Sequence, residues 1–228
     1  MNKLLSSTLA LAASLAFAFP AAAQDAKPGD KTAGSMKVAM CIGCHNIPNY
    51  QGTFPEVYKV PKIAGQGARY IVSALTAYRK GDRKHPTMRA IASSLTDQDI
   101  ADVAAFYESL GKTGSDPLPA QASIQPAPEV AKLLAQANCA SCHGANFSTP
   151  IDPTYPKLAG QHADYLYAAL KAYQTDKNPH VGRSNAIMMG MARPFTHPEL
   201  KSLSAYLASL PGDVKTVPES RFRGPNQF

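Results

Sequence analysis

The sequence predicts an all-α fold made of two similar halves, because the same motifs occur twice in the same order. In both halves apolar residues recur at i, i+4 and i+8, the spacing that places side chains on one face of a helix. No segment shows the alternation of apolar and polar residues that indicates a half-buried strand. We therefore expect two small helical domains, residues 24–112 and 129–212, each with a modest core of its own.

The first 23 residues are predicted to be an export signal. Lys3 supplies a positive charge, residues 9–19 are apolar, and the small residues that follow suit cleavage near Ala23. An uncleaved membrane anchor is the alternative, but the apolar run falls short of the ~20 residues that span a bilayer. The mature protein is therefore expected in the periplasm or an equivalent compartment.

Each half has a predicted helix after a Pro-Lys-Ile/Leu-Ala-Gly-Gln segment, which ends at Gln66 or Gln161. A later helix closes each half. It follows Thr96 or Thr196, and an acidic residue three positions on completes a capping-box pattern. The apolar face of the earlier helix consists of equivalent residues: Tyr70, Ile71, Ala74, Leu75 and Tyr78 in the first half, and Tyr165, Leu166, Ala169, Leu170 and Tyr173 in the second.

Two further segments lie outside these domains. Residues 113–128 contain four prolines and predict an extended, fairly stiff linker. Pro211 and Gly212 end the last helix, and the tail over 213–228 is a candidate docking contact.

The net charge of +7 is mild for a chain of 228 residues. It does not favour a nucleic-acid partner, and it suits docking to an acidic redox protein or peripheral association with a membrane. One basic group could steer such a partner, or it could be ordinary solvated surface. Its members are Arg79, Lys80, Arg83, Lys84 and Arg89.

All four cysteines fall in two C-x-x-C-H motifs, the attachment sequence for c-type haem. Cys41 and Cys44 form one pair, and Cys139 and Cys142 form the other. The two thiols of a pair add to the two vinyl groups of one haem. The adjacent histidine, His45 or His143, is then held under the ring as an iron ligand. The motifs predict two covalently attached haem c groups.

Other uses of paired cysteines fit less well. A structural or redox-active disulfide is common in exported proteins, but the latter usually accompanies a βαβ pattern, which this sequence lacks. Four cysteines could also bind zinc. Here, however, each pair has its own histidine and its own copy of the surrounding sequence.

The sixth iron ligand decides whether a haem site is closed or open. Met88 is the only methionine downstream of the first motif within its half. In the second half the repeat selects Met188, because both stand four residues before an alanine and eight before the capping threonine. Met189 and Met191 remain competitors, although Met191 aligns with an apolar residue and suits packing.

Four histidines, His85, His162, His180 and His197, do not recur in both halves and are expected to cap helices or lie on the surface. Arg83 and Arg183 do recur. They could pair with haem propionates, because guanidinium groups favour carboxylates, or they could be solvated charges.

Over residues 36–211 the chain resembles the dihaem cytochrome c4 family, on both haem motifs, both Pro-Lys-Ile/Leu-Ala-Gly-Gln segments and both Met-x-x-x-Ala-x-x-Leu/Phe-Thr blocks. The resemblance implies two tandem class I cytochrome c domains. It also implies His/Met ligation and proline carbonyls, from Pro61 and Pro156, that accept the second N–H of each axial histidine. The second half departs from this pattern by extra residues over 178–183.

The function implied by the resemblance is single-electron transfer in the periplasm, towards a terminal oxidase, without enzymatic activity. Two alternatives remain open. One is a haem subunit of a larger oxidoreductase complex. The other is a dihaem enzyme such as a peroxidase or a thiosulfate dehydrogenase, which would need an open or displaceable iron ligand.

Overall fold

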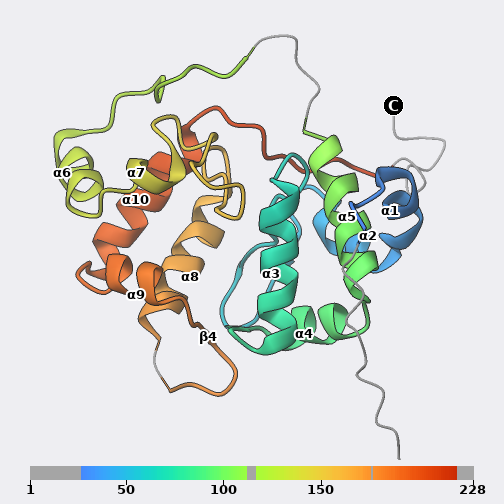
Figure 1. The fold of residues 1–228 in the computed structure, drawn as a ribbon. Coiled ribbons are helices and arrows are strands. Elements are labelled where there is room, and N and C mark those ends of the chain that lie inside the picture. The colour runs from blue at the N-terminus through green and yellow to red at the C-terminus, as the bar shows by residue number, and fades with distance from the viewer. Residues whose placement is uncertain (1–26, 112–116, 176, 220–228) are drawn as a thin grey trace, which may run out of the picture.

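The computed structural model describes residues 27–111, 117–175 and 177–219, which form two helical lobes side by side (Figure 1). The predicted signal peptide lies outside these residues, as do Arg221 and Arg223 in the tail. The first lobe contains α1 (Lys31–Lys37), α2 (Ala39–His45), α3 (Ala68–Lys80), α4 (Pro86–Ser93) and α5 (Asp97–Ser109). The second contains α6 (Pro128–Gln136), α7 (Ala140–His143), α8 (Ala163–Gln174), α9 (Ala186–Ala192) and α10 (His197–Ser209).

The two lobes repeat one arrangement, in which the first and last helices pack together. In the first lobe α1 packs on α5, and in the second α6 packs on α10. A capping box starts each last helix: the backbone N–H of Thr96 donates to Asp99 Oδ2 over 3.0 Å, and that of Thr196 donates to Glu199 Oε2 over 2.7 Å. The predicted helical repeat is therefore confirmed.

The core of the first lobe is one cluster, which includes Val38, Ile100, Val103 and Tyr107. The second lobe buries two smaller clusters, one around Phe147 and Leu207 and one around Phe195 and Leu200. Each cluster also contacts a cysteine of its lobe's haem motif, Cys41 in the first lobe and Cys139 in the second. The core of each lobe therefore contacts one of its two predicted attachment points.

The helix crossing in the first lobe depends on Gly34. A Cβ atom at this position would lie 2.1 Å from the carbonyl oxygen of Asp102 on α5, so only glycine allows the two backbones to approach. We expect Gly34→Ala to destabilise the protein by about 1–3 kcal/mol, as overpacking of a tight contact does. Denaturant titration measures this. Gly52→Ala is the matched control, because a Cβ there meets no atom within 4 Å.

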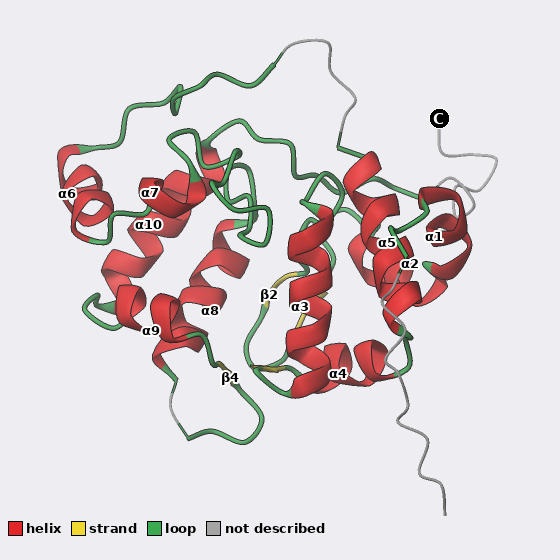
Figure 2. Ribbon diagram, in the orientation of Figure 1, coloured by secondary structure: helices red, strands yellow, loops and turns green. Residues whose placement is uncertain are grey.

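Short strands are present where the sequence shows no strand pattern. Four two-residue strands lie in the described residues: β1 (Gln51–Gly52), β2 (Tyr58–Lys59), β3 (Arg83–Lys84) and β4 (Gly182–Arg183) (Figure 2). β1 and β2 form a hairpin within the first lobe, whereas β3 pairs antiparallel with β4 across the two lobes. Pairs this short leave no periodic signal, because alternation needs several residues.

The lobes meet along α3 and α8, with a reciprocal pair of glutamines at the contact (Figure 1). Gln66 accepts a hydrogen bond from the backbone N–H of Lys157 over 2.9 Å and donates to the carbonyl of Lys157 over 3.0 Å. Gln161 makes the same two bonds to Lys62, over 2.9 and 2.8 Å. An ion pair between Lys171 and Glu56 adds to the contact. The lobes are therefore docked through specific bonds related by the repeat.

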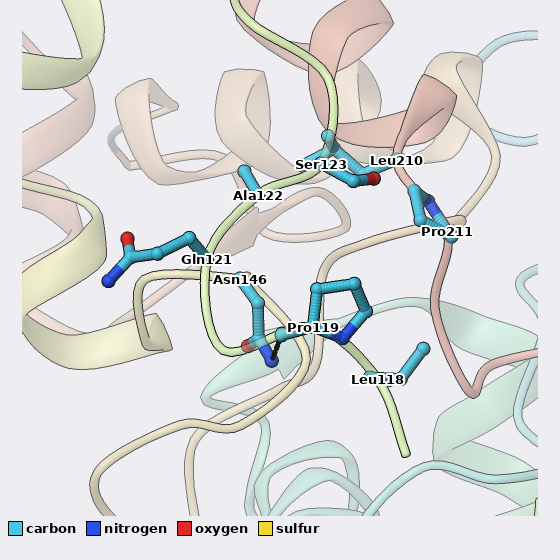
Figure 3. A pocket seen from close by; sticks show the side chains of 8 residues that line it. All are labelled: Leu118, Pro119, Gln121, Ala122, Ser123, Asn146, Leu210 and Pro211. Atoms are coloured by element: carbon cyan, nitrogen blue, oxygen red, sulfur yellow. Dashed lines mark hydrogen bonds between the residues drawn. The ribbon is translucent and has the colours of Figure 1, made fainter. Parts of the chain in front are cut away.

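The linker packs on the second lobe. The Asn146 side chain donates to the carbonyl of Pro119 over 2.8 Å, and Tyr206 donates to the carbonyl of Ile124 over 2.9 Å. Figure 3 shows the depression lined by the linker residues Pro119 and Ser123 and by Leu210 and Pro211, which is too shallow to hold a ligand. Over residues 117–127 the linker contains no helix or strand and has bends at residues 120–121 and 123–124, and these two bonds fix its path. The exact domain boundaries stay a prediction.

The described part of the tail returns to the first lobe (Figure 1). The backbone N–H of Lys215 donates to the carbonyl of Ala64 over 2.9 Å, Val214 is buried, and Val217 packs against the first core. Asp213 pairs with Lys157 over 2.7 Å. These residues form a strap between lobes, which is a more definite role than the docking contact expected from the sequence.

Candidate haem sites

The two C-x-x-C-H motifs occupy equivalent helices, α2 and α7, and the histidine is the last residue of each. His45 Nδ1 lies 2.9 Å from the carbonyl oxygen of Pro61, and His143 Nδ1 lies 3.0 Å from that of Pro156. A carbonyl can only accept, so Nδ1 carries the proton. The Nε2 lone pair of a neutral ring is then free to bind a metal.

Both histidines are held in the neutral form. Burial lowers the pKa of His45 and of His143, and the proline carbonyls only partly oppose this effect. A neutral, oriented imidazole with a second hydrogen bond is the form that ligates iron, and the hydrogen bond raises its basicity. The arrangement therefore fits an axial haem ligand in each lobe.

The surroundings of the cysteines do not favour a redox-active disulfide or a zinc site. Burial raises the pKa of Cys41 to about 11 and also raises that of Cys139. A redox-active C-x-x-C pair instead has a lowered thiol pKa. Within the described residues, no three His, Cys, Asp or Glu side chains gather as a zinc site requires. The thiols are placed beside the core, where a large apolar group would lie.

Met88 and Met188 occupy the same position in equivalent helices. Each is the third residue of its helix, α4 or α9, and its backbone N–H donates to the side chain of the N-cap residue. The cap is His85 Nδ1 at 3.3 Å in the first lobe and Asn185 Oδ1 at 3.0 Å in the second. The match found by sequence spacing therefore extends to three dimensions.

The competing methionines occupy other positions. Met189 is equivalent to Arg89, since their backbone N–H groups donate to the carbonyls of Asn185 and His85. Met191 is 42% exposed, so the packing role expected for it is wrong. Neither residue shares the position of Met88.

The spare histidines have the expected roles. His85 caps α4, His162 precedes α8, and His180 and His197 are exposed. None of them is matched by a histidine at the equivalent position of the other lobe; the N-cap position of His85, for example, is occupied there by Asn185. His85 lies near enough to His45 for its charge to lower the pKa of His45, but its Nδ1 accepts the backbone N–H of Met88.

Arg83 and Arg183 face each other across the lobes, because they are register partners in the β3–β4 pair. Arg83 stacks on the rings of Tyr70 and Tyr78. Arg183 stacks in the same way on Tyr165 and Tyr173. Both arginines line a cavity of about 40 Å³ between the lobes. They are therefore interface residues, and the solvated-surface interpretation is wrong.

This cavity is strongly cationic. Within the described residues neither arginine has a carboxylate within ion-pair distance; the shown partners are tyrosine rings and hydroxyls. At Tyr165 burial opposes ionisation, yet the charges of Arg183 and Arg83 outweigh it and lower the pKa. Two such guanidinium groups suit the carboxylates of a bound anionic group.

The basic group that the sequence placed around the first methionine is dispersed in the structure. Arg79 pairs with Asp97, Lys84 donates to the carbonyl of Asn178 over 2.7 Å, and Arg83 lies in the cavity between the lobes. The carboxylate of Asp97 neutralises Arg79, and Arg83 is enclosed between the lobes, so these charges do not share one exposed surface. The group is therefore not a continuous docking patch.

Sequence reasoning missed the role of Gln66 and Gln161. Both residues belong to the repeated segment, whose likeness aligns the two halves but does not show that the halves touch there. The structure shows them buried, with relative exposures of 3% and 4%, and bonded to the opposite lobe. A polar residue that recurs in an apolar segment was the available signal, because buried polar groups need partners.

Comparison with known proteins agrees with this geometry. The Cytochrome c family model matches residues 31–111 and 128–211, one match in each lobe. The chain is 31% identical to cytochrome c4 of Stutzerimonas stutzeri, over 80% of this chain and 90% of that protein. It is also 31% identical to a thiosulfate dehydrogenase electron acceptor of S. stutzeri strain A1501, over 89% and 94% of the two chains.

A solved structure supports the same assignment. The crystal structure of reduced recombinant cytochrome c4 from Pseudomonas stutzeri superposes with a TM-score of 0.56 at 29% identity, covering 80% of this chain and 99% of that one. Among the described helices of the present chain, none is long and apolar enough to cross a bilayer. The two matched lobes, the two haem motifs and these relatives together show that the chain belongs to the dihaem cytochrome c4 family, whose members transfer electrons and are not enzymes.

Proposed function

We propose that the chain is a periplasmic carrier of single electrons in a respiratory chain, with one haem c in each lobe. Cys41 and Cys44 attach the first haem, and His45 and Met88 are its axial ligands. In the second lobe the corresponding residues are Cys139, Cys142, His143 and Met188. The proposal rests chiefly on one observation: both lobes place a neutral histidine and a capped methionine at equivalent positions.

A bound haem supplies an iron centre that accepts and releases one electron. The chain's own residues set the conditions for that exchange. The proline carbonyls fix the ring orientation and tautomer of the histidines. The thioethers of Met88 and Met188 would occupy the sixth position of each iron, which would exclude other ligands and favour a high potential. Cys41 and Cys139 pack against the apolar core of their lobes, which would place an attached haem beside that core.

Arg83 and Arg183 are proposed to neutralise haem propionates at the junction between the lobes. Their location makes a single cationic site from both halves, and the expected anion is the one that each haem carries. This accounts for two half-buried arginines that lack carboxylate partners among the described residues. It also predicts that haem binding and the docking of the lobes support each other.

Replacement of Arg183 tests this pairing. Arg183→Met should destabilise the haem-containing protein by about 3 kcal/mol, because it leaves a partly buried carboxylate without its partner. Arg193→Met is the matched control, since Arg193 is exposed on the same lobe and a change there should stay within about 0.5 kcal/mol. Guanidinium titration followed at the haem absorbance measures both. If Arg183→Met and Arg193→Met both lowered the free energy of unfolding by the same small amount, Arg183 would not be a propionate partner.

Export and the direction of transfer are also part of the proposal. The apolar N-terminal segment supports export of the chain. Export also fits the two haem motifs, because haem is attached to c-type cytochromes after export. The electron acceptor is proposed to be a terminal oxidase at the membrane, reached by protein docking or by peripheral association. No nucleic-acid partner is proposed, because the net charge of the chain is mild.

Carbon monoxide distinguishes a carrier from an enzyme. The purified protein should contain two haems, and after reduction neither should bind carbon monoxide. Haem content by the pyridine haemochrome spectrum and difference spectra with carbon monoxide measure these two properties. Rapid binding at either haem in the unmodified protein would show an open iron and would favour an enzyme.

The second candidate function is the electron acceptor of a thiosulfate dehydrogenase. The similarity to such an acceptor over 89% of this chain favours it. The oxidised protein would then be reduced by thiosulfate only when a thiosulfate dehydrogenase is present, and at a rate that exceeds its reduction by quinol-oxidising complexes. Comparison of the two reduction rates by stopped-flow absorbance separates this role from that of a general respiratory carrier.

A further inference from the structure

The interlobe glutamines contact the same peptide groups that hold the axial histidines. The peptide between Pro61 and Lys62 accepts from His45 Nδ1 through its carbonyl, over 2.9 Å. Its N–H donates to Oε1 of Gln161 in the other lobe, also over 2.9 Å. One planar amide therefore joins the proximal histidine of the first lobe to a glutamine of the second.

The second lobe contains the reciprocal arrangement. The peptide between Pro156 and Lys157 accepts from His143 Nδ1 over 3.0 Å, and its N–H donates to Oε1 of Gln66 over 2.9 Å. Each glutamine oxygen also accepts the backbone N–H of the residue that follows it, which fixes the side chain. Each axial histidine is thus connected, through one peptide group, to a glutamine of the opposite lobe, and the two connections cross the interface in opposite directions.

Hydrogen bonds joined through an amide strengthen one another. When the N–H of a peptide donates, electron density moves to its carbonyl oxygen, which becomes a better acceptor. A stronger bond from histidine Nδ1 to that oxygen makes the ring more basic at Nε2. A more basic axial ligand favours ferric iron, and second-shell hydrogen bonding is one of the means by which proteins set haem potentials.

We propose that Gln161 and Gln66 are positioning residues that tune the haem of the opposite lobe. Gln161 lowers the potential of the first haem by polarising the carbonyl of Pro61, and Gln66 does the same for the second haem through Pro156. The inference rests on the proposed ligation by His45 and His143. Its consequence is that docking of the lobes and the potential of each haem are linked.

The crossed geometry gives a crossed test with Gln161→Met and Gln66→Met. Methionine has a similar size and cannot bond to the Lys62 or Lys157 backbone. At a fixed electrode potential, Gln161→Met should raise the reduced-to-oxidised ratio of the first haem about twofold, the size expected when one polarising neighbour is lost. The ratio of the second haem should not change. Gln66→Met should do the reverse. Spectroelectrochemistry with NMR assignment of each haem's axial-methionine methyl signal measures both ratios.

A purely structural role for the glutamines predicts a different pattern. If the glutamines only fasten the lobes together, either substitution would loosen the interface and shift the potentials of both haems alike. If neither potential shifted, the glutamines would have no effect through the Pro61 and Pro156 carbonyls. The ¹⁵N shift of histidine Nδ1 gives a second readout, and it should change only in the lobe opposite the substitution. If the unmodified protein lacked two His-ligated haems, the proposed function would fail first, independently of these variants.

Discussion

Replacement of Met188 with alanine is expected to open the second iron to carbon monoxide while the first stays closed. The thioether is the proposed sixth ligand of the second haem, and alanine cannot reach the iron. The ferric protein should lose about half of its methionine-to-iron charge-transfer absorbance, and the reduced protein should bind about one carbon monoxide per chain. Absorbance titration with carbon monoxide measures the stoichiometry.

Two nearby methionines provide matched controls for this result. Met189→Ala and Met191→Ala should leave the charge-transfer absorbance intact, because neither residue shares the helix position of Met88. Met88→Ala should reproduce the effect of Met188→Ala at the first haem. If Met191→Ala, rather than Met188→Ala, opened the iron, the ligand assignment from the repeat would be wrong.

Removal of one pair of cysteines should cost a whole haem. We expect Cys139→Ala combined with Cys142→Ala to yield a chain with one covalent haem, in which the second lobe is largely unfolded. The core of that lobe consists of two small clusters that meet at Cys139, so little apolar burial remains without the attached group. Mass spectrometry gives the number of haems, and far-ultraviolet circular dichroism gives the loss of helix.

The corresponding change in the first lobe is the control for this prediction. Cys41→Ala with Cys44→Ala should also leave one haem, but it should preserve more helix, because the first core is a single larger cluster that includes Val38, Ile100 and Tyr107. A doubly substituted second lobe that kept its full helix content would show that the haem is not part of its core.

Much of this fold could be predicted because the sequence contains two copies of the same pattern, so an assignment in one half can be compared with the other half. Met188 was chosen from three methionines by its spacing to a capping threonine, and the structure places it where Met88 lies in the other lobe. The capping residues Thr96 and Thr196 begin the helices they were expected to begin. These features depend on local spacing, which a sequence displays directly.

The contacts between the lobes could not be predicted in the same way. The sequence allows Arg83 and Arg183 to lie near the haem propionates or in solvent, and nothing in the chain order indicates that β3 pairs with β4. The tail strap at Lys215 depends on Ala64, about 150 residues earlier in the chain. Such bonds join distant segments through a few backbone groups, so they leave no periodic pattern to detect.

The presence of a closed His/Met iron in each lobe is tested most directly by proton NMR of the fully reduced protein. Methionine ligation places the methyl group against the haem face, where the ring current shifts its signal far from those of other methyl groups. The account predicts two such signals of equal intensity, one lost in Met88→Ala and the other in Met188→Ala. A single signal, or none, in the unmodified protein would contradict the assignment of two equivalent electron-transfer sites.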